Sequence, residues 1–256
     1  MLVLALVLLC ISNFENAQSS PTRSKRMVEG TEAFPGEFPY QVSIRNTFSH
    51  QHHCGGVIIH EKHVLTAAHC VDQFDPEDFE VMSGSINLKK PGPVNQVIAI
   101  HVAKNFQQPG KNDIAVLEVQ DDFIFDDLTA PANLPAKNYV ILEGSHAVMS
   151  GFGRTVAQGA NSVLLRKAKT KISNLDLCRK MYPKNFFDDS MICTTNLGRQ
   201  GICRGDSGGP LVVQGIVVGI TSYTNYGCAD TNYPLVFANV SQLIDFIDHS
   251  ISKYKS

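Results

Sequence analysis

Short apolar stretches recur along most of the chain, and residues that favour turns separate them. Many of these stretches are rich in β-branched and aromatic residues, which favour strands. Strands are predicted at residues 40–45, 57–59, 79–83, 97–102, 114–119, 146–152, 211–221 and 234–239. Strands at this spacing are typical of barrels and sandwiches and not of βαβ units, so we predict an all-β protein.

The end of the chain follows a helical period instead. Asn239 or Ser241 is available to cap the first turn. The polar face carries Asp245 and Asp248 and no row of basic residues, so we expect this helix to pack against the β-structure and not on a membrane surface. The apolar residues that share its other face are Val240, Leu243, Ile244, Ile247 and Ile251.

The N-terminal residues show a third pattern. The apolar run 2–11 is too short to span a bilayer, and small polar residues follow it. We therefore predict a secretory signal peptide over residues 1–19, although no basic side chain precedes the run; a buried N-terminal strand is the alternative interpretation. No other stretch is long and apolar enough for a membrane anchor, so we expect a secreted, extracellular protein with no membrane partner.

Charge and cysteine content narrow the class of function. The formal net charge is −2 and no large basic cluster is present, which argues against a nucleic-acid partner. Cys10 lies in the predicted signal peptide, and the even number of cysteines after it favours disulfides in an exported chain, although six cysteines allow fifteen pairings. These six are Cys54, Cys70, Cys178, Cys193, Cys203 and Cys228.

A zinc site is the alternative use of the cysteines and histidines. The chain has no compact Cys-x-x-Cys or His-x-x-x-His pair to support it. His52 and His53 are expected to lie in a solvated loop. We therefore expect no metal and no cofactor.

A glycine-rich stretch carries the clearest chemistry. Residues 205–210 read Gly-Asp-Ser-Gly-Gly-Pro, in which the glycines allow positive φ and Pro210 stiffens the exit, so Ser207 is expected to be presented from a loop. A serine is a weak nucleophile near neutral pH and needs a histidine base and an orienting carboxylate. His69, in Thr-Ala-Ala-His-Cys, and Asp113, in Asn-Asp-Ile-Ala-Val, supply both in the order His, Asp, Ser.

On these three motifs the chain resembles the chymotrypsin/trypsin-like serine endopeptidases, from about Met27 to the C-terminus. The resemblance implies one protease domain over residues 27–256. It also implies two six-stranded antiparallel β-barrels that divide near residues 127–135, with the C-terminal helix packed on the second barrel. In this family the cysteines pair locally, which implies the disulfides Cys54–Cys70, Cys178–Cys193 and Cys203–Cys228.

The resemblance also implies a role for each residue of the motifs. Ser207 would attack the scissile carbonyl while His69 takes its proton, and Asp113 would hold the imidazole in the correct tautomer. The backbone N–H groups of Gly205 and Ser207 would form the oxyanion hole. Ser222 matches the family serine that hydrogen-bonds to the aspartate and begins the strand that receives the substrate.

The residues before the protease domain predict activation by cleavage. The basic pair Lys25 and Arg26 precedes an apolar residue, which is typical of a processing site. The resemblance implies a zymogen with residues 20–26 as its propeptide and an activating protease that cleaves after Arg26. The new ammonium group of Met27 would then pair with Asp206. Met27 replaces a β-branched residue, but its flexible side chain can fill an apolar slot.

The resemblance also places the substrate pocket. Gly201 lies at its floor, where an aspartate would select Lys or Arg, and Ile202 follows. Thr224 and Leu235 replace the glycines of the pocket walls, so we expect cleavage after an apolar residue, as in elastase-like or chymotrypsin-like enzymes. Tyr223 replaces the family tryptophan of the substrate-binding strand.

Residues outside the catalytic motifs indicate the partners and the ligands of the protein. Arg204 is expected at the pocket rim, where it would favour acidic residues near the scissile bond. We expect protein or peptide substrates, protein protease inhibitors and a monomeric chain. The loop after Gly84 lacks carboxylates, so no calcium site is expected, and Asn239 begins a glycosylation sequon. The alternative function is a protease-like binding protein with little turnover, which Met27 and the filled pocket would explain.

Overall fold

The computed structural model describes residues 30–156, 158–184, 186–196, 201–224, 228 and 233–252. Residues 1–29, with Arg26 and Met27, lie outside this part of the chain. The strands are β1 (Thr31–Glu32), β2 (Gln41–Asn46), β3 (His52–His60), β4 (His63–Thr66), β5 (Phe79–Met82), β6 (Val94–Val102), β7 (Ala115–Val119), β8 (His146–Gly151), β9 (Arg166–Ile172), β10 (Met191–Asn196), β11 (Pro210–Val213), β12 (Ile216–Tyr223) and β13 (Leu235–Asn239). The helices are α1 (Leu175–Met181) and α2 (Val240–Ser252), and neither is long and apolar enough to cross a membrane.

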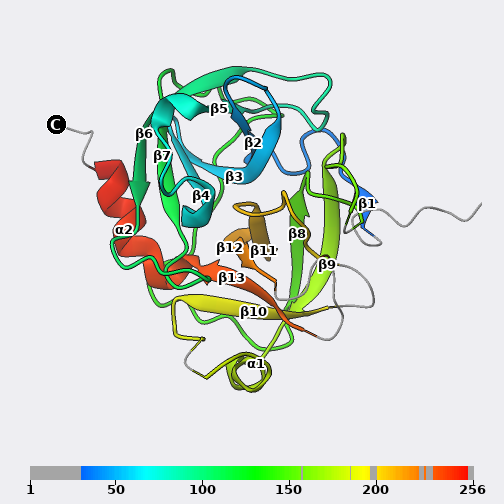
Figure 1. Cartoon of the computed structure of the whole chain (residues 1–256), viewed down its shortest axis with the longest axis vertical. Coiled ribbons are helices and arrows are strands. Elements are labelled where there is room, and N and C mark those ends of the chain that lie inside the picture. Colours follow the sequence, from blue (N-terminus) through cyan, green and yellow to red (C-terminus); the bar gives the residue numbers. More distant parts are fainter. Residues whose placement is uncertain are drawn as a thin grey trace, which may run out of the picture.

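The strands form two closed antiparallel barrels (Figure 1). The first closes in the order β2-β3-β4-β7-β6-β5. The second closes in the order β8-β9-β10-β13-β12-β11, because β8 pairs with both β9 and β11, and β1 adds to it through β9. This arrangement confirms the prediction of two six-stranded antiparallel barrels. The connection between them runs from residue 120 to residue 145, a range that includes 127–135.

The strand prediction omits β1, β4, β9 and β10, and β9 shows why. Every second residue of β9 from Arg166 to Ile172 is buried, while Lys167, Lys169 and Lys171 are more exposed. The alternation is therefore that of a half-buried strand. Since the buried positions include an arginine and a threonine, the hydrophobic signal in the sequence is weak.

The predicted strand 211–221 is a hairpin in the structure. β11 and β12 are joined by Gln214 and Gly215, whose φ angles are 51° and 80°. Two successive residues with positive φ form the tight turn whose twist suits a β-hairpin. Glutamine is not a usual residue for this conformation, so the turn is hidden among apolar neighbours.

The C-terminal helix α2 has the apolar face that the sequence predicts. Leu243, Ile244 and Ile247 are buried, and they share one core cluster with residues of both barrels. Helix α2 lies against β12 of the second barrel and β7 of the first. The expectation that it packs on the second barrel is therefore confirmed, and the helix also contacts the first barrel at β7, beside which it lies in Figure 1.

Candidate active site

His69 and Asp113 are held together by two hydrogen bonds. His69 lies in a short 3₁₀ helix, Ala68–Cys70, that follows β4, and Asp113 lies two residues before β7. The Nδ1–H of His69 donates to Asp113 Oδ2 at 2.7 Å, and the backbone N–H of His69 donates to Asp113 Oδ1 at 2.9 Å. One carboxylate oxygen therefore fixes the imidazole ring and the other fixes its backbone. Because the ring proton lies on Nδ1, Nε2 carries a free lone pair.

The Asp113 carboxyl is buried but remains ionised near neutral pH. Burial raises its pKa, but hydrogen bonds from His69 and Ser222 and the charge of His69 outweigh burial and hold the pKa below its usual range. The Ser222 hydroxyl, on β12, donates to Asp113 Oδ2 at 2.6 Å. The structure thus brings Ser222 to the carboxylate, as the resemblance implies.

Ser207 lies in a loop that is anchored to the first barrel. Its carbonyl accepts a hydrogen bond from the N–H of Gly55 on β3 at 2.8 Å. A β-carbon on the next residue, Gly208, would lie 3.3 Å from the backbone nitrogen of Ala67, two residues before His69. Ser207 is half-buried, and within the described part of the chain its hydroxyl makes no hydrogen bond with His69. The structure therefore places the two loops side by side without that bond.

Gly205 has a backbone conformation that favours glycine. Its φ is +93°, and a β-carbon there would lie 3.0 Å from Asn161 Oδ1 and 3.1 Å from Gly153 Cα. Its carbonyl accepts a hydrogen bond from His52 Nε2 at 2.8 Å. The orientation of the peptide that follows Gly205 is therefore fixed by a side chain of the first barrel.

His52 itself was expected in a solvated loop, and that expectation is wrong. It begins β3 and is 9% exposed, whereas His53, also in β3, is exposed and has its ring Nε2 2.8 Å from the Cys70 carbonyl. Burial lowers the pKa of His52 to about 4, so the ring is neutral at physiological pH. With Nε2–H donating to Gly205, Nδ1 accepts from the Ser43 hydroxyl at 2.7 Å. The chain Ser43–His52–Gly205 is a supporting contact that the sequence motifs do not reveal.

Asp206 is buried beneath the Ser207 loop. It is 1% exposed, and its carboxylate accepts from the N–H groups of Gly153 at 2.8 Å and Cys203 at 2.9 Å. Burial raises its pKa to about 7, although the two N–H groups lower it. No side-chain cation contacts it among the residues that the structure describes. Its predicted partner, the Met27 ammonium group, lies outside them.

The predicted pocket residues divide between the core and the surface. Gly201, Ile202 and Leu235 are buried, and the last two belong to one apolar cluster of the second barrel. Arg204 is exposed. Ser222 is buried behind the site, while Tyr223 and Thr224 are half-buried. The aromatic ring of Tyr223 lies 5.5 Å from that of Phe186 and 6.2 Å from that of Tyr182.

The disulfides of the structure are Cys54–Cys70, Cys178–Cys193 and Cys203–Cys228, the pairs that the resemblance implies. Cys54, His69 and Cys70 also bring three potential metal-ligand atoms within 4.8 Å of one another. Both sulfur atoms are in the disulfide, so they are not thiolates and do not offer a zinc site. This is the single such group within the described ranges.

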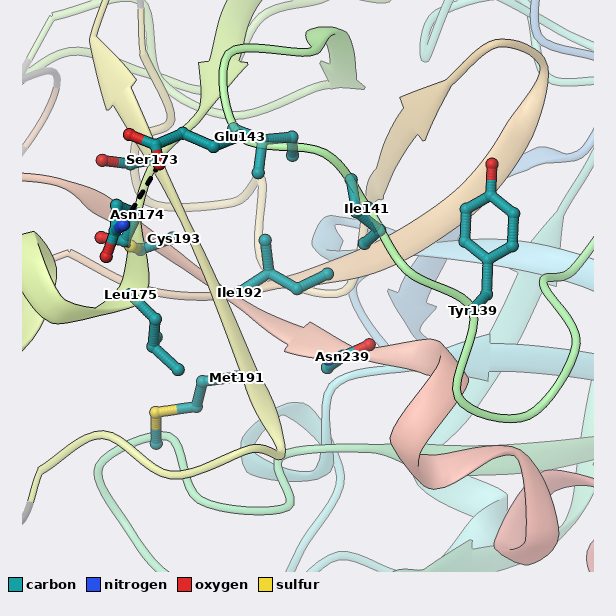
Figure 2. A pocket seen from close by; sticks show the side chains of 11 residues that line it. Tyr139, Ile141, Glu143, Ser173, Asn174, Leu175, Met191, Ile192, Cys193 and Asn239 are labelled. Carbon is teal, nitrogen blue, oxygen red and sulfur yellow. Dashed lines mark hydrogen bonds between the residues drawn. The ribbon is translucent and has the colours of Figure 1, made fainter.

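A separate pocket of about 260 Å³ lies on the second barrel, between β10 and the segment that leads into β8 (Figure 2). None of the predicted catalytic or pocket residues lines it. Glu143 accepts a hydrogen bond from Asn174 on one side of the pocket, and Asn239 borders it farther along. The Asn239 amide group donates to the Asp189 carbonyl at 3.2 Å, so the sequon asparagine is already engaged in the fold.

Comparisons with known proteins agree with this architecture. The family model described as Trypsin matches residues 27–247. The chain is 34% identical over 256 residues to the vitellin-degrading protease of Bombyx mori, covering 97% of this chain and 96% of that one. It is 38% identical over 223 residues to chymotrypsin-2 of Vespa crabro, covering 86% and 98%.

Solved structures give the same result for the fold. The structure of neuropsin, a serine protease expressed in the limbic system of mouse brain, matches with a TM-score of 0.79 and 28% identity over 87% of this chain and 99% of that one. Human heparin binding protein matches with a TM-score of 0.78 and 26% identity, covering 87% and 96%.

Proposed function

The chain belongs to the trypsin family of serine endopeptidases, and from that premise we propose that His69, Asp113 and Ser207 are its catalytic triad. The observation that carries this proposal is the pair of hydrogen bonds that holds the His69 ring against a buried, ionised Asp113. A ring fixed in this tautomer presents Nε2 as a base for the Ser207 hydroxyl.

The proposed reaction is hydrolysis of a peptide bond through an acyl-enzyme. The oxygen of Ser207 forms a bond to the scissile carbonyl carbon while His69 Nε2 takes its proton. His69 then gives this proton to the leaving amine as the peptide C–N bond breaks. Water next attacks the ester carbon while His69 takes a proton from it, and that proton passes to the Ser207 oxygen as its bond to the acyl carbon breaks and the acid product leaves. The N–H groups of Gly205 and Ser207 stabilise the oxyanion, and each such donor is worth about 3–4 kcal/mol.

A peptide library tests this proposal. Chain cleaved after Arg26 should hydrolyse peptides after apolar residues, and the uncleaved chain should not. A processed, folded chain that cleaves no peptide would instead support the protease-like binding protein. The same experiment with a protein inhibitor of serine proteases would test whether such inhibitors are partners, and sedimentation would test the proposed monomer.

We further propose that the protein is secreted as a zymogen. Residues 1–19 would be removed as the signal peptide, and an activating protease would remove residues 20–26. The Met27 ammonium group would then neutralise Asp206, whose burial beneath the Ser207 loop supports this pairing. An extracellular location is consistent with the three disulfides.

The uncleaved chain should lose stability as pH rises. Without the Met27 ammonium group, the folded state holds the Asp206 proton up to about pH 7, whereas the unfolded state releases it near 3.8. The native state therefore binds more protons between these values, and this group lowers the free energy of unfolding by up to about 4 kcal/mol across that range.

Urea unfolding between pH 4 and 7 measures this effect. As pH rises, the free energy of unfolding of the uncleaved chain should fall relative to that of the same chain with Asp206→Asn, which cannot ionise at that position. Parallel stability curves for the two proteins would contradict the account.

If Leu235 lines the proposed pocket, replacing it should change the preference for the P1 residue. Leu235 is fully buried in the same apolar cluster as Ile202, so Leu235→Ala should open space for larger side chains. Preference for Phe over Val at P1 should rise about 10-fold or more, with about 2–5 kcal/mol of stability lost. Leu117→Ala, equally buried in the first barrel, should lose similar stability without this shift. Equal P1 preferences in the two variants would show that Leu235 does not line the pocket.

A further inference from the structure

The segment that follows the proposed cleavage site is held by strand β9 of the second barrel. β1 consists of Thr31 and Glu32, both exposed, and it lies outside the closed barrel. Among the described strands it pairs with β9 alone, through the registers Thr31↔Lys167 and Glu32↔Arg166. Such a short strand contributes little stability by itself. The buried Ala33 adds a backbone hydrogen bond to the Leu165 carbonyl at 3.0 Å, and side-chain contacts from β9 hold the segment further.

Within the part of the chain that the structure describes, Arg166 makes the contact nearest to the cleavage site. It lies on the inward-facing side of β9 and is 7% exposed. Its Nη2 donates to the Gly30 carbonyl at 2.6 Å, and its Nη1 lies 3.4 Å from Glu32 Oε1. A planar guanidinium can hold a carbonyl and a carboxylate at the same time, which a lysine ammonium group does less well.

The neighbouring Lys167 contacts a later part of the same segment. Its ammonium group pairs with Glu37 and lies 5.1 Å from the centre of the Phe34 ring. Two adjacent residues of β9 therefore hold the chain at two places. Arg166 fixes Gly30 and Glu32, and Lys167 fixes the residues that follow.

We infer that Arg166 is a positioning residue for activation, because it fixes the chain three residues from the new N-terminus. Three residues reach at most about 10 Å, so a fixed Gly30 confines the Met27 ammonium group to a small volume. Ordering the segment in advance lowers the entropic cost of placing that group against Asp206. This inference rests on the proposed activation by Met27 and assigns the arginine that makes it efficient.

The test compares Arg166→Gln with Lys167→Gln in chain cleaved after Arg26. Activity is expected to fall at alkaline pH, because the Met27 ammonium group loses its proton and no longer pairs with Asp206. Arg166→Gln should weaken insertion about tenfold, which lowers the midpoint of this alkaline loss by about one pH unit. It should also speed chemical acylation of the Met27 amine about tenfold at fixed pH. Lys167→Gln, which loses the contacts with Glu37 and Phe34 farther along the segment, should leave both values close to wild type.

Further variants separate positioning from folding. Arg166→Lys should recover part of the shift, and Glu32→Gln, at a half-exposed side chain, should move both readouts in the same direction by a smaller amount. If folded Arg166→Gln kept the wild-type alkaline midpoint and the wild-type rate of amine acylation, the inference about Arg166 would be overturned and the proposed activation would stand. If wild-type protein kept full activity after its Met27 amine was blocked, the proposed activation would fail and the inference with it.

Discussion

Replacing Ser207 with alanine is expected to lower kcat/KM by about 10⁶-fold, because the variant has no oxygen that can form the acyl-enzyme. His69 and Asp113 would keep their hydrogen bonds, since neither of these bonds involves Ser207. Binding of peptide substrates should change little. Hydrolysis of an apolar-P1 peptide by cleaved protein, with Tm and circular dichroism as checks on folding, measures the effect.

Ser252→Ala is the matched control for this variant. Ser252 is an exposed serine at the end of α2 and takes no part in the site. Its kcat/KM should stay at the wild-type value. A Ser207→Ala protein that retained more than a few per cent of activity would mean that another nucleophile acts.

Blocking the cleavage after Arg26 is expected to leave the protein almost inactive. In Arg26→Gln, Met27 keeps its peptide bond and offers no ammonium group, so Asp206 remains a buried carboxyl without its partner. Loss of one member of a buried ion pair costs about 3–5 kcal/mol, which corresponds to a 100-fold or greater loss of the ordered state. Activity should be measured after incubation with a trypsin-like activating protease.

Arg23→Gln controls for the change of charge in the propeptide. It removes a basic residue of the same segment but leaves the bond after Arg26 intact, so it should be activated as the wild type is. N-terminal sequencing should then find Met27 as the terminus in the control but not in Arg26→Gln, where a cut after Lys25 would leave one residue ahead of Met27. Full activity of uncut Arg26→Gln would contradict the zymogen proposal.

The fold was predictable from the sequence where the physical signal is local. The helical period after Asn239 and the strands of the first barrel other than β4 follow from residue pattern alone, and the number of barrels follows from the resemblance. β9 escapes prediction because Arg166 takes an inward position that is usually apolar. The β11–β12 turn was not predicted, because Gln214 adopts a positive φ and glutamine is not a residue type that indicates such a turn.

The candidate site was predictable as far as its motifs extend. His69, Asp113 and Ser207 each stand in a recognisable stretch, and Ser222 follows from the resemblance. The contact of His52 with Gly205 joins residues 153 positions apart, so it depends on the barrels and not on any local pattern. His52 lies two residues before the disulfide residue Cys54, but a histidine at that spacing has no distinctive signal by itself.

The most direct test of the central claim is covalent labelling of the nucleophile. Protein cleaved after Arg26 should react with a fluorophosphonate, which phosphonylates activated serines, and peptide mass spectrometry should find one adduct per chain, on Ser207. Labelling should be lost in Ser207→Ala and should be at least about 100-fold slower in Arg26→Gln. An adduct on a different residue, or hydrolysis by a protein whose Ser207 stays unlabelled, would contradict the assignment of Ser207 as the nucleophile.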